Sequence, residues 1–378
     1  MRIAQISPLW ERVPPPAYGG TEAVVHALTE GLVARGHEVV LFASGDSLTS
    51  AELRSVYPRS LRTASDLADP SPYDWLHVAS ALADAHEFDI IHNHAGELAM
   101  AMARLVPVPM LTTMHCLITK DTKIIWDNYG GYYNTISQAA RQTIPADVPS
   151  TNFVGVVYNG IDVASYPFRA EKDGHLLFLS RLAPEKGPHI AIEVARRLGT
   201  PLVLAGKVDR VDREYFQTMV EPLVDGERVR YVGEVRREDT KELFAAARAL
   251  LLPIVWEEPF GLVMPEAMAT GTPVIAFRRG AAPELIVDGE TGFLVDEGDV
   301  DGMVAAVRNL GHLDPRHCRQ HVEDQFDVNR MVDGYIATYE RVLLRTKPQG
   351  ANLRAITIAE DVRPSPAAGS PDELREVS

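Results

Sequence analysis

Short β-branched and aliphatic runs alternate with longer amphipathic stretches along most of this chain. Residues 1–7 (MRIAQIS) predict a strand, and residues 21–35 repeat apolar side chains at helical spacing. Thr21 is the expected N-cap of that helix, and Gly36 is the expected left-handed residue after its end. Such alternation is typical of a parallel sheet whose strands are connected by helices. Further strands are expected here at residues 38–43, 89–91, 110–113, 132–136 and 153–157.

The same pattern starts again at residues 175–180 (HLLFLS), a predicted strand that is followed by a predicted helix at 188–198. A last helix is expected at residues 329–344. Later strands of this second series are expected at residues 202–205, 229–232, 250–254, 274–277 and 293–295. The periodicity therefore predicts an α/β protein with two parallel-sheet domains in tandem.

The domain boundaries follow from where the pattern restarts. We expect a first domain at residues 1–163, completed by the C-terminal helix at about 328–346, and a second domain at residues 170–327. The segment Asn159–Arg169 (NGIDVASYPFR) is the expected hinge. Residues 347–378 contain Pro, Gly, Ser and many charges, with little to bury, and are expected to form a disordered tail.

Composition narrows the classes of partner. The chain has 378 residues, 37 Lys and Arg against 52 Asp and Glu, and a net charge of −15, so neither nucleic acid nor stable membrane insertion is expected. Two distant cysteines, Cys116 and Cys318, give neither a disulfide framework nor a zinc spacing. No signal-peptide pattern opens the sequence, and Arg104, Pro107 and Pro109 interrupt its most apolar stretch. These features predict a cytoplasmic protein.

Candidate chemistry is sought in the loops after strands, because open α/β sheets bind ligands beyond the carboxyl ends of their strands. Neither G-x-G-x-x-G nor a P-loop motif occurs, which disfavours a dehydrogenase or a P-loop kinase. The first candidate loop contains Gly19 and Gly20 before a helix start, where backbone amides can approach an anion. A tight turn is the alternative explanation for these glycines.

The second candidate loop, residues 180–187 (SRLAPEKG), places Arg181 and Lys186 where both can reach one phosphate group. Two solvated loop cations are the alternative. The third and most specific candidate is residues 257–269 (EEPFGLVMPEAMA), in which Pro265 is the expected first residue of a short helix. Glu258 and Glu266, eight residues apart, can accept hydrogen bonds from two groups of hydroxyls. Solvation of Glu258 and a helix-dipole interaction of Glu266 are the alternatives.

Together these segments resemble the retaining glycosyltransferases of family 4, from Met1 to about Leu344. The resemblance rests on Glu258 to Glu266, which match an E-x7-E motif, and on the SRLAPEKG loop. It also rests on YNGID at Tyr158–Asp162 and on PELIVDGETGFLV at Pro283–Val295. It implies the GT-B fold, in which two Rossmann-like domains have parallel sheets that face a central cleft. It implies a hexosyltransferase that moves a sugar from a nucleoside-diphosphate sugar to a hydroxyl acceptor.

The resemblance also implies roles for individual residues. Arg181 and Lys186 would hold the donor diphosphate, Glu266 the ribose hydroxyls and Glu258 the hydroxyls of the transferred sugar. Gly20 would present its amide to the donor, and His115 would approach the donor sugar. The residues expected to bind the donor are Gly19, Gly20, Gly206, Lys207, Val235, Phe260, Gly261, Leu262 and Glu266. Those expected to act in catalysis are Arg181, Lys186, Glu258 and His115.

Acceptor-side residues are less specific. Glu22, His94 and Tyr129 are candidates, although Glu22 can instead brace the glycine loop, His94 can be structural and Tyr129 can pack in the core. No carboxylate completes a metal site with His92 and His94. The segment Gly280–Pro283 departs from the double glycine usual in the family, so Ala281 or Ala282 is expected to alter the wall of the sugar subsite.

The expected mechanism needs no cofactor and no metal. Arg181, Lys186 and amides at helix starts can stabilise the charge on the departing diphosphate, and no D-x-D is expected to bind a metal in a predicted donor loop. The co-substrate would be a UDP-sugar or a GDP-sugar, with an ADP-sugar as a third option. The acceptor would be a saccharide, a lipid-linked sugar or a small metabolite. The alternatives are a GT-B epimerase or hydrolase of sugar nucleotides, and a non-catalytic protein that binds them.

Overall fold

The computed structural model describes residues 1–346, so the tail expected at residues 347–378 lies outside the described residues. The first sheet has the order β3-β2-β1-β4-β5-β6-β7, and all of its strand pairs are parallel. Its strands are β1 Arg2–Ile6, β2 Glu38–Phe42, β3 Glu52–Arg54, β4 Ile90–Asn93, β5 Met110–Met114, β6 Tyr132–Thr135 and β7 Phe153–Val156. Only the short edge strand β3 was not expected from the sequence.

The second sheet has the order β10-β9-β8-β11-β12-β13 and is also parallel throughout. Its strands are β8 Leu176–Leu179, β9 Leu202–Ala205, β10 Val229–Tyr231, β11 Leu250–Leu252, β12 Val274–Phe277 and β13 Gly292–Val295. Each of them was expected to within two residues. The two parallel sheets confirm the expected α/β class with two Rossmann-like domains.

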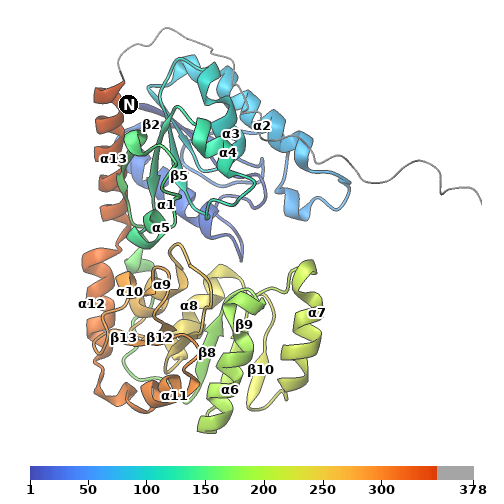
Figure 1. The fold of residues 1–378 in the computed structure, drawn as a ribbon, viewed down its shortest axis with the longest axis vertical. Coiled ribbons are helices and arrows are strands. Elements are labelled where there is room, and N and C mark those ends of the chain that lie inside the picture. The colour runs from blue at the N-terminus through green and yellow to red at the C-terminus, as the bar shows by residue number, and fades with distance from the viewer. Residues whose placement is uncertain (347–378) are drawn as a thin grey trace, which may run out of the picture.

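Helices cover both faces of each sheet. They are α1 Gly20–Ala34, α2 Ser71–Ala83, α3 Glu97–Met102, α4 Lys123–Asn128, α5 Gln138–Gln142, α6 Pro188–Leu198, α7 Arg213–Tyr215, α8 Arg237–Ala246, α9 Val263–Ala269, α10 Ala282–Leu285, α11 Val300–Arg308, α12 Pro315–Gln325 and α13 Val328–Arg345. Side chains of α1 and α13 form one core of the first domain with its sheet, and α2 to α5 contribute to the core on the other face. Figure 1 shows α13 beside the first domain, although it follows the second domain in the sequence.

Two helix starts differ from expectation. The N-cap of α1 is Gly19 and not Thr21, because the helix already begins at Gly20. Helix α9 begins at Val263, so Pro265 is its third residue, where proline is still tolerated because the first-turn amides have no partner within the helix. Gly36 has the expected positive φ of 79°.

The chain crosses between the domains at two points that lie side by side. Ile161 N donates to Phe326 O at 2.9 Å, and Val328 N donates to Ile161 O at 2.9 Å. Gly160 makes this approach possible, because a Cβ built there would lie 2.8 Å from Val328 Cα and 2.9 Å from Asp327 O. The glycine of the YNGID segment is therefore required for the contact between the two crossings.

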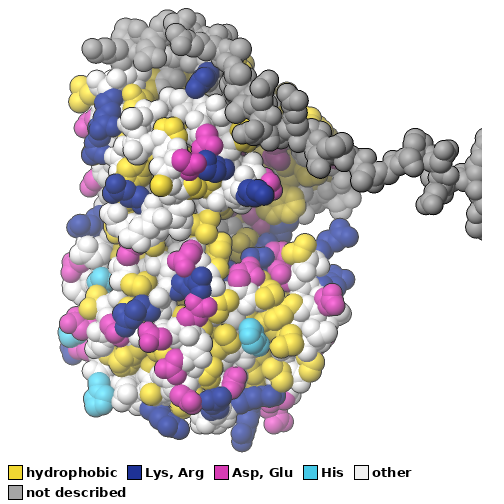
Figure 2. Space-filling model, viewed as in Figure 1, with side chains coloured by type: hydrophobic (Ala, Val, Ile, Leu, Met, Phe, Trp, Pro, Cys, Tyr) yellow, Lys and Arg dark blue, Asp and Glu magenta, His cyan; other side chains and the backbone are white. Residues whose placement is uncertain are grey.

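The surface in view carries charges of both signs. Figure 2 shows Lys and Arg interspersed with Asp and Glu over both domains, without an extended patch of one sign on this face. Among residues 1–346 there is no helix both long enough and apolar enough to span a membrane.

Replacing Gly160 with alanine should lower the free energy of unfolding by about 1–3 kcal/mol, because the added methyl group meets backbone that cannot rotate away. Chemical unfolding of the purified chain measures this. Gly174→Ala is the matched control, since a Cβ there meets no atom within 4 Å and the change should stay within about 0.5 kcal/mol. Equal stability of the two variants would contradict the packing argument.

Candidate active site

A cavity of about 460 Å³ lies between the two domains. The first domain contributes the loop before α1 and the end of β5, and the second domain contributes the loops that follow β8, β9, β10 and β11. Every residue that was expected to act in catalysis or bind the donor lines this cavity. They are Gly19, Gly20, His115, Arg181, Lys186, Gly206, Lys207, Val235, Glu258, Phe260, Gly261, Leu262 and Glu266.

Lys186 and Glu258, which both line the cavity, form an ion pair. Trp256 Nε1 donates to the same carboxylate oxygen of Glu258 at 2.9 Å, and Lys186 Nζ lies 4.6 Å from the centroid of the Trp256 ring. Lys186 is buried, which strengthens its interaction with the carboxylate because little water screens it. Oxygen Oε2 of Glu258 is thus engaged, whereas Oε1 has no hydrogen-bond partner in the part of the chain that the structure describes.

Arg181 is held by carboxylates of its own domain. It pairs with Glu185, four residues later in the chain, with Asp212 at 3.1 Å and with Asp209 at 3.7 Å. The guanidinium is therefore fixed at the cavity wall, and an anionic ligand would exchange with these carboxylates as its partner.

Glu266 is buried in the first turn of α9. Its Oε1 accepts hydrogen bonds from Arg237 at 2.6 Å and from Tyr166 Oη at 3.0 Å. Arg237 and Trp256 were not expected from the sequence. Both follow strands of the second sheet closely, so the rule that ligands bind beyond strand ends is the signal that could have found them.

Contacts across the cleft hold the two domains together. Lys207 Nζ lies 3.9 Å from the centroid of the Tyr18 ring, a cation–π contact. Glu234 pairs with Arg62 of the first domain and accepts from Tyr18 N at 3.4 Å. In addition, Arg237 N donates to Pro16 O at 2.9 Å. The glycine loop is thereby docked against the second domain.

His115 contributes a neutral side chain to the cavity. Its Nε2 lies 2.9 Å from Nδ1 of His94, and burial lowers the pKa of His115 from the usual 6.5 to about 4. At neutral pH this imidazole carries no charge, so it acts as a hydrogen-bonding group.

Two of the acceptor candidates lie away from this cavity. His94 and Tyr129 are buried and do not line the cavity. Both ring nitrogens of His94 are engaged by His115 and Gln5, and the hydroxyl of Tyr129 bonds Thr112 at 2.9 Å. The structure therefore favours a structural role for His94 and packing for Tyr129. Glu22 is buried beneath the glycine loop, 3.1 Å from a Cβ built on Gly19, which favours bracing of that loop.

Ala281 and Ala282 do not form the cavity wall. Both are buried in a core cluster of the second domain, contrary to expectation. Ala281 acts through its backbone, because its N–H donates to Glu258 O at 2.9 Å and so supports the loop that carries Glu258.

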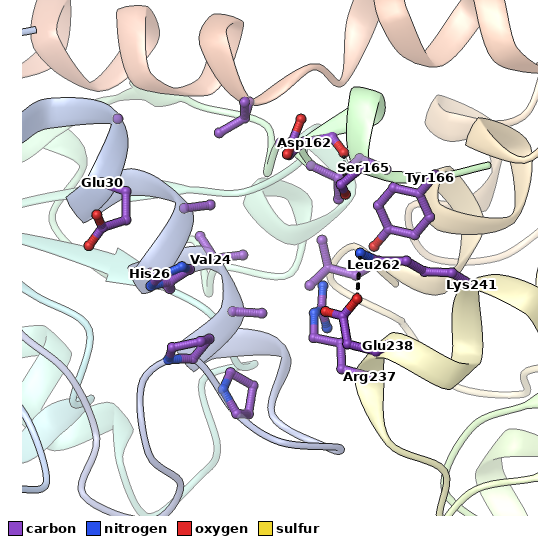
Figure 3. A pocket seen from close by; sticks show the side chains of 18 of the residues that line it. Val24, His26, Glu30, Asp162, Ser165, Tyr166, Arg237, Glu238, Lys241 and Leu262 are labelled. Carbon is purple, nitrogen blue, oxygen red and sulfur yellow. Dashed lines mark hydrogen bonds and ion pairs between the residues drawn. The ribbon is translucent and has the colours of Figure 1, made fainter. Parts of the chain in front are cut away.

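A second cavity, of about 640 Å³, adjoins the first. Figure 3 shows it between α1, which contributes Val24 and His26, Tyr166 of the segment 159–169, and α8 with Arg237 and Lys241. Arg237 and Leu262 line both cavities. The predicted catalytic residues lie in the first cavity alone, so that cavity is the candidate active site. Within residues 1–346, no three His, Cys, Asp or Glu side chains are grouped so that they could hold a metal ion.

Comparison with known proteins agrees with this geometry. The fold and the site define a glycosyltransferase of the GT-B fold. A family model described as Glycosyltransferase Family 4 matches residues 18–165, and one described as Glycosyl transferases group 1 matches residues 166–323. Together they span both domains, and the chain belongs to the family 4 glycosyltransferases, enzymes that transfer a sugar from a nucleotide-sugar donor.

Individual relatives cover nearly the whole chain. The glycogen synthase of Mycobacterium tuberculosis is 29% identical over 396 residues, covering 86% of this chain and 91% of the relative. The phosphatidyl-myo-inositol mannosyltransferase of Mycobacterium leprae is 28% identical over 344 residues, covering 82% and 88%. The solved structure of AviGT4, a glycosyltransferase involved in avilamycin A biosynthesis, matches with a TM-score of 0.71 and 26% identity, covering 91% of this chain and 98% of that one.

Glu22 makes stability depend on pH. Burial raises the pKa of this carboxyl from 4.5 to about 7, so the folded chain favours the protonated form. The stability that the protonated Glu22 carboxyl contributes to the folded chain is complete below pH 4.5 and is lost as the pH rises through 7. Relative to Glu22→Gln, the wild-type free energy of unfolding should fall by on the order of 2–3 kcal/mol from pH 4.5 to 8. Urea unfolding of both proteins across this range measures the difference, and parallel curves would contradict a buried titrating Glu22.

Proposed function

We propose that this enzyme transfers a hexose from a UDP-sugar or a GDP-sugar to a hydroxyl acceptor, with retention at the anomeric carbon and without a metal ion. The observation that carries the proposal is the convergence of two cations, Arg181 and Lys186, with two carboxylates, Glu258 and Glu266, on one cavity. The acceptor is the hydroxyl of a saccharide, a lipid-linked sugar or a small metabolite.

The donor lies along the second domain in this proposal. Arg181 and Lys186 bind the diphosphate, and Glu266 accepts hydrogen bonds from the ribose hydroxyls through the oxygen that Arg237 leaves free. Gly206, Lys207 and Val235 surround the base, and Gly20 presents its amide from the first domain. His115 approaches the transferred sugar.

Leaving-group stabilisation explains why no metal is needed. The diphosphate gains one negative charge as the glycosidic bond breaks, and each charge-assisted hydrogen bond contributes roughly 1.5–3 kcal/mol. Lys186 is well suited to this task because it is buried and already supports a charged partner.

Retention proceeds by front-face attack in this proposal. Oxygen Oε2 of Glu258 accepts from Lys186 and Trp256, and these bonds stabilise its charge and weaken it as a nucleophile. Glu258 therefore positions sugar hydroxyls. The departing phosphate oxygen takes the proton of the acceptor hydroxyl while the new C–O bond forms on the same face.

The domain boundaries given above, residues 1–163 with about 328–346 and residues 170–327, belong to the same proposal. Closure about the Asn159–Arg169 hinge would exclude water from the donor and limit its hydrolysis.

A nucleotide panel tests the donor site. Thermal unfolding is followed with UDP, GDP, ADP and their common sugar conjugates, with NAD as the negative control. A ligand at about 100 times its Kd adds roughly 2.7 kcal/mol of stability. Arg181→Ala should lose this protection and reduce kcat/KM roughly 10- to 150-fold. The matched control is Arg197→Ala, which also removes an Arg–Glu pair four residues apart but lies outside the cavity. No protection by any nucleotide would refute the proposal.

Glu258→Gln tests the role of the first motif carboxylate. Turnover should fall about 10- to 100-fold, because the sugar loses a charged acceptor of hydrogen bonds, while protection by the nucleoside diphosphate persists. Glu257→Gln is the control, since Glu257 pairs with Arg279 and does not line the cavity. Added azide should give no glycosyl azide with the Glu258 variant. An azide adduct would identify Glu258 as a nucleophile and refute the front-face route.

A further inference from the structure

A buried chain of hydrogen bonds connects the active-site cavity with the C-terminal helix. It starts at His115 and passes through side chains of the first sheet to two tyrosines of α13. Its members, in spatial order, are His115, His94, Gln5, Tyr339, His92, Thr113, Asn134 and Tyr335. All but His115 are buried.

The distances along the chain are short. His115 Nε2 lies 2.9 Å from His94 Nδ1, and His94 Nε2 lies 2.8 Å from Gln5 Oε1. Gln5 Nε2 donates to Tyr339 Oη at 3.0 Å, and that hydroxyl lies 2.7 Å from His92 Nδ1.

The far end continues in the same way. His92 Nε2 lies 2.7 Å from Thr113 Oγ1, which lies 2.8 Å from Asn134 Oδ1 and 3.1 Å from Tyr335 Oη. The chain is therefore continuous from the cavity to α13.

A backbone carbonyl fixes the direction of the chain. Asn134 Nδ2 donates to Thr135 O at 3.3 Å, so Oδ1 of Asn134 faces Thr113. An amide oxygen only accepts, and the single hydroxyl proton of Thr113 must therefore point at it. Thr113 Oγ1 can then only accept from His92, so Nε2 of His92 carries the ring proton.

The remaining protons of the chain, from His92 to the cavity, are fixed in turn. Burial lowers the pKa values of His92 and His94 well below 6.5, so each ring has one proton. Nδ1 of His92 then accepts from Tyr339, and the Tyr339 oxygen accepts from Gln5 Nε2. Gln5 Oε1 accepts from His94 Nε2, which leaves Nδ1 of His94 to accept from His115 Nε2.

His115 is consequently left with a bare Nδ1. This nitrogen has no hydrogen-bond partner within residues 1–346, and it is not one of their enclosed unpaired atoms, so it is open to the cavity that His115 lines. A bare imidazole nitrogen accepts a hydrogen bond and does not donate one.

We propose that Gln5 and Tyr339 are positioning residues, which hold His115 in the tautomer that presents Nδ1 to the cavity as an acceptor for a sugar hydroxyl. The C-terminal helix thereby contributes to the active site without touching it. The partner of Nδ1 rests on the proposed function, whereas the tautomer rests on the hydrogen-bond chain alone.

Nitrogen NMR of the full chain, labelled at histidine and recorded at neutral pH without donor, tests the tautomer. The His115 ring should show a protonated Nε2 and an unprotonated Nδ1. In Tyr339→Phe, which removes the hydroxyl between Gln5 and His92, the direction is no longer fixed, and the two His115 nitrogen shifts should move toward each other as the tautomers mix. Thr113→Val interrupts the chain at a second point and should have the same effect if Tyr339→Phe does not fold.

The control is Tyr133→Phe. Tyr133 is also buried in the first domain, but its hydroxyl bonds Pro149 O at 3.0 Å, outside the chain, so the spectrum of Tyr133→Phe should match the wild type.

Tyr339→Phe should also lower kcat about fivefold to tenfold, because the loss of one neutral hydrogen bond to the sugar costs about 1 kcal/mol. Protection against unfolding by the nucleoside diphosphate alone should be unchanged.

A protonated Nδ1 in the wild type would overturn the proposal, and so would unaltered His115 shifts in both Tyr339→Phe and Thr113→Val. The spectra need no donor. A failure of the proposed transfer would therefore leave the tautomer result standing, and a failure of the tautomer result would leave the nucleotide panel standing.

Discussion

The double crossing between the domains is the constraint on which the rest of the structure depends. Residues 161 and 326–328 are hydrogen-bonded side by side, so the two chain crossings between the domains lie at the same edge. From that edge, α13 packs back onto the first sheet and becomes part of its core. The carboxyl ends of the two sheets therefore face each other across the cavity, and loops that are distant in sequence meet there.

The two domains contribute groups of different charge to the cavity. The second domain supplies the fixed charges, Arg181, Lys186, Glu258 and Glu266, each with a partner of opposite charge. Such pairing is expected, because an unpaired charge in a poorly solvated site is costly. The first domain supplies backbone amides and the neutral His115, and none of its described residues that line the cavity is Lys or Arg.

The fold was predictable because parallel strands buried on both faces are nearly continuous apolar runs. Residues 202–205 and 274–277 were expected with their observed bounds. The three-residue strand β3 was missed because it lies at a sheet edge and has only one apolar residue.

The motif residues were predictable because they follow strands directly. The buried position of Tyr129 was not predictable, because a polar–aromatic segment has the same sequence pattern whether it lines a groove or packs in the core. Arg237 was missed because its link to Glu266 arises only when α8 packs beside α9.

The buried chain of hydrogen bonds that ends at His115 explains the alternating histidines His92 and His94. Alternating histidines such as His92 and His94 at a strand end resemble a metal pair, and no local signal shows their true partners. Those partners are Gln5 on β1 and Tyr339 on α13, which are 334 residues apart. A polar group in a core is tolerated only when its hydrogen bonds are satisfied, so each member of the chain constrains the next. Because the first sheet cannot satisfy this chain without α13, the return of that helix completes both the core of the first domain and the orientation of the His115 ring.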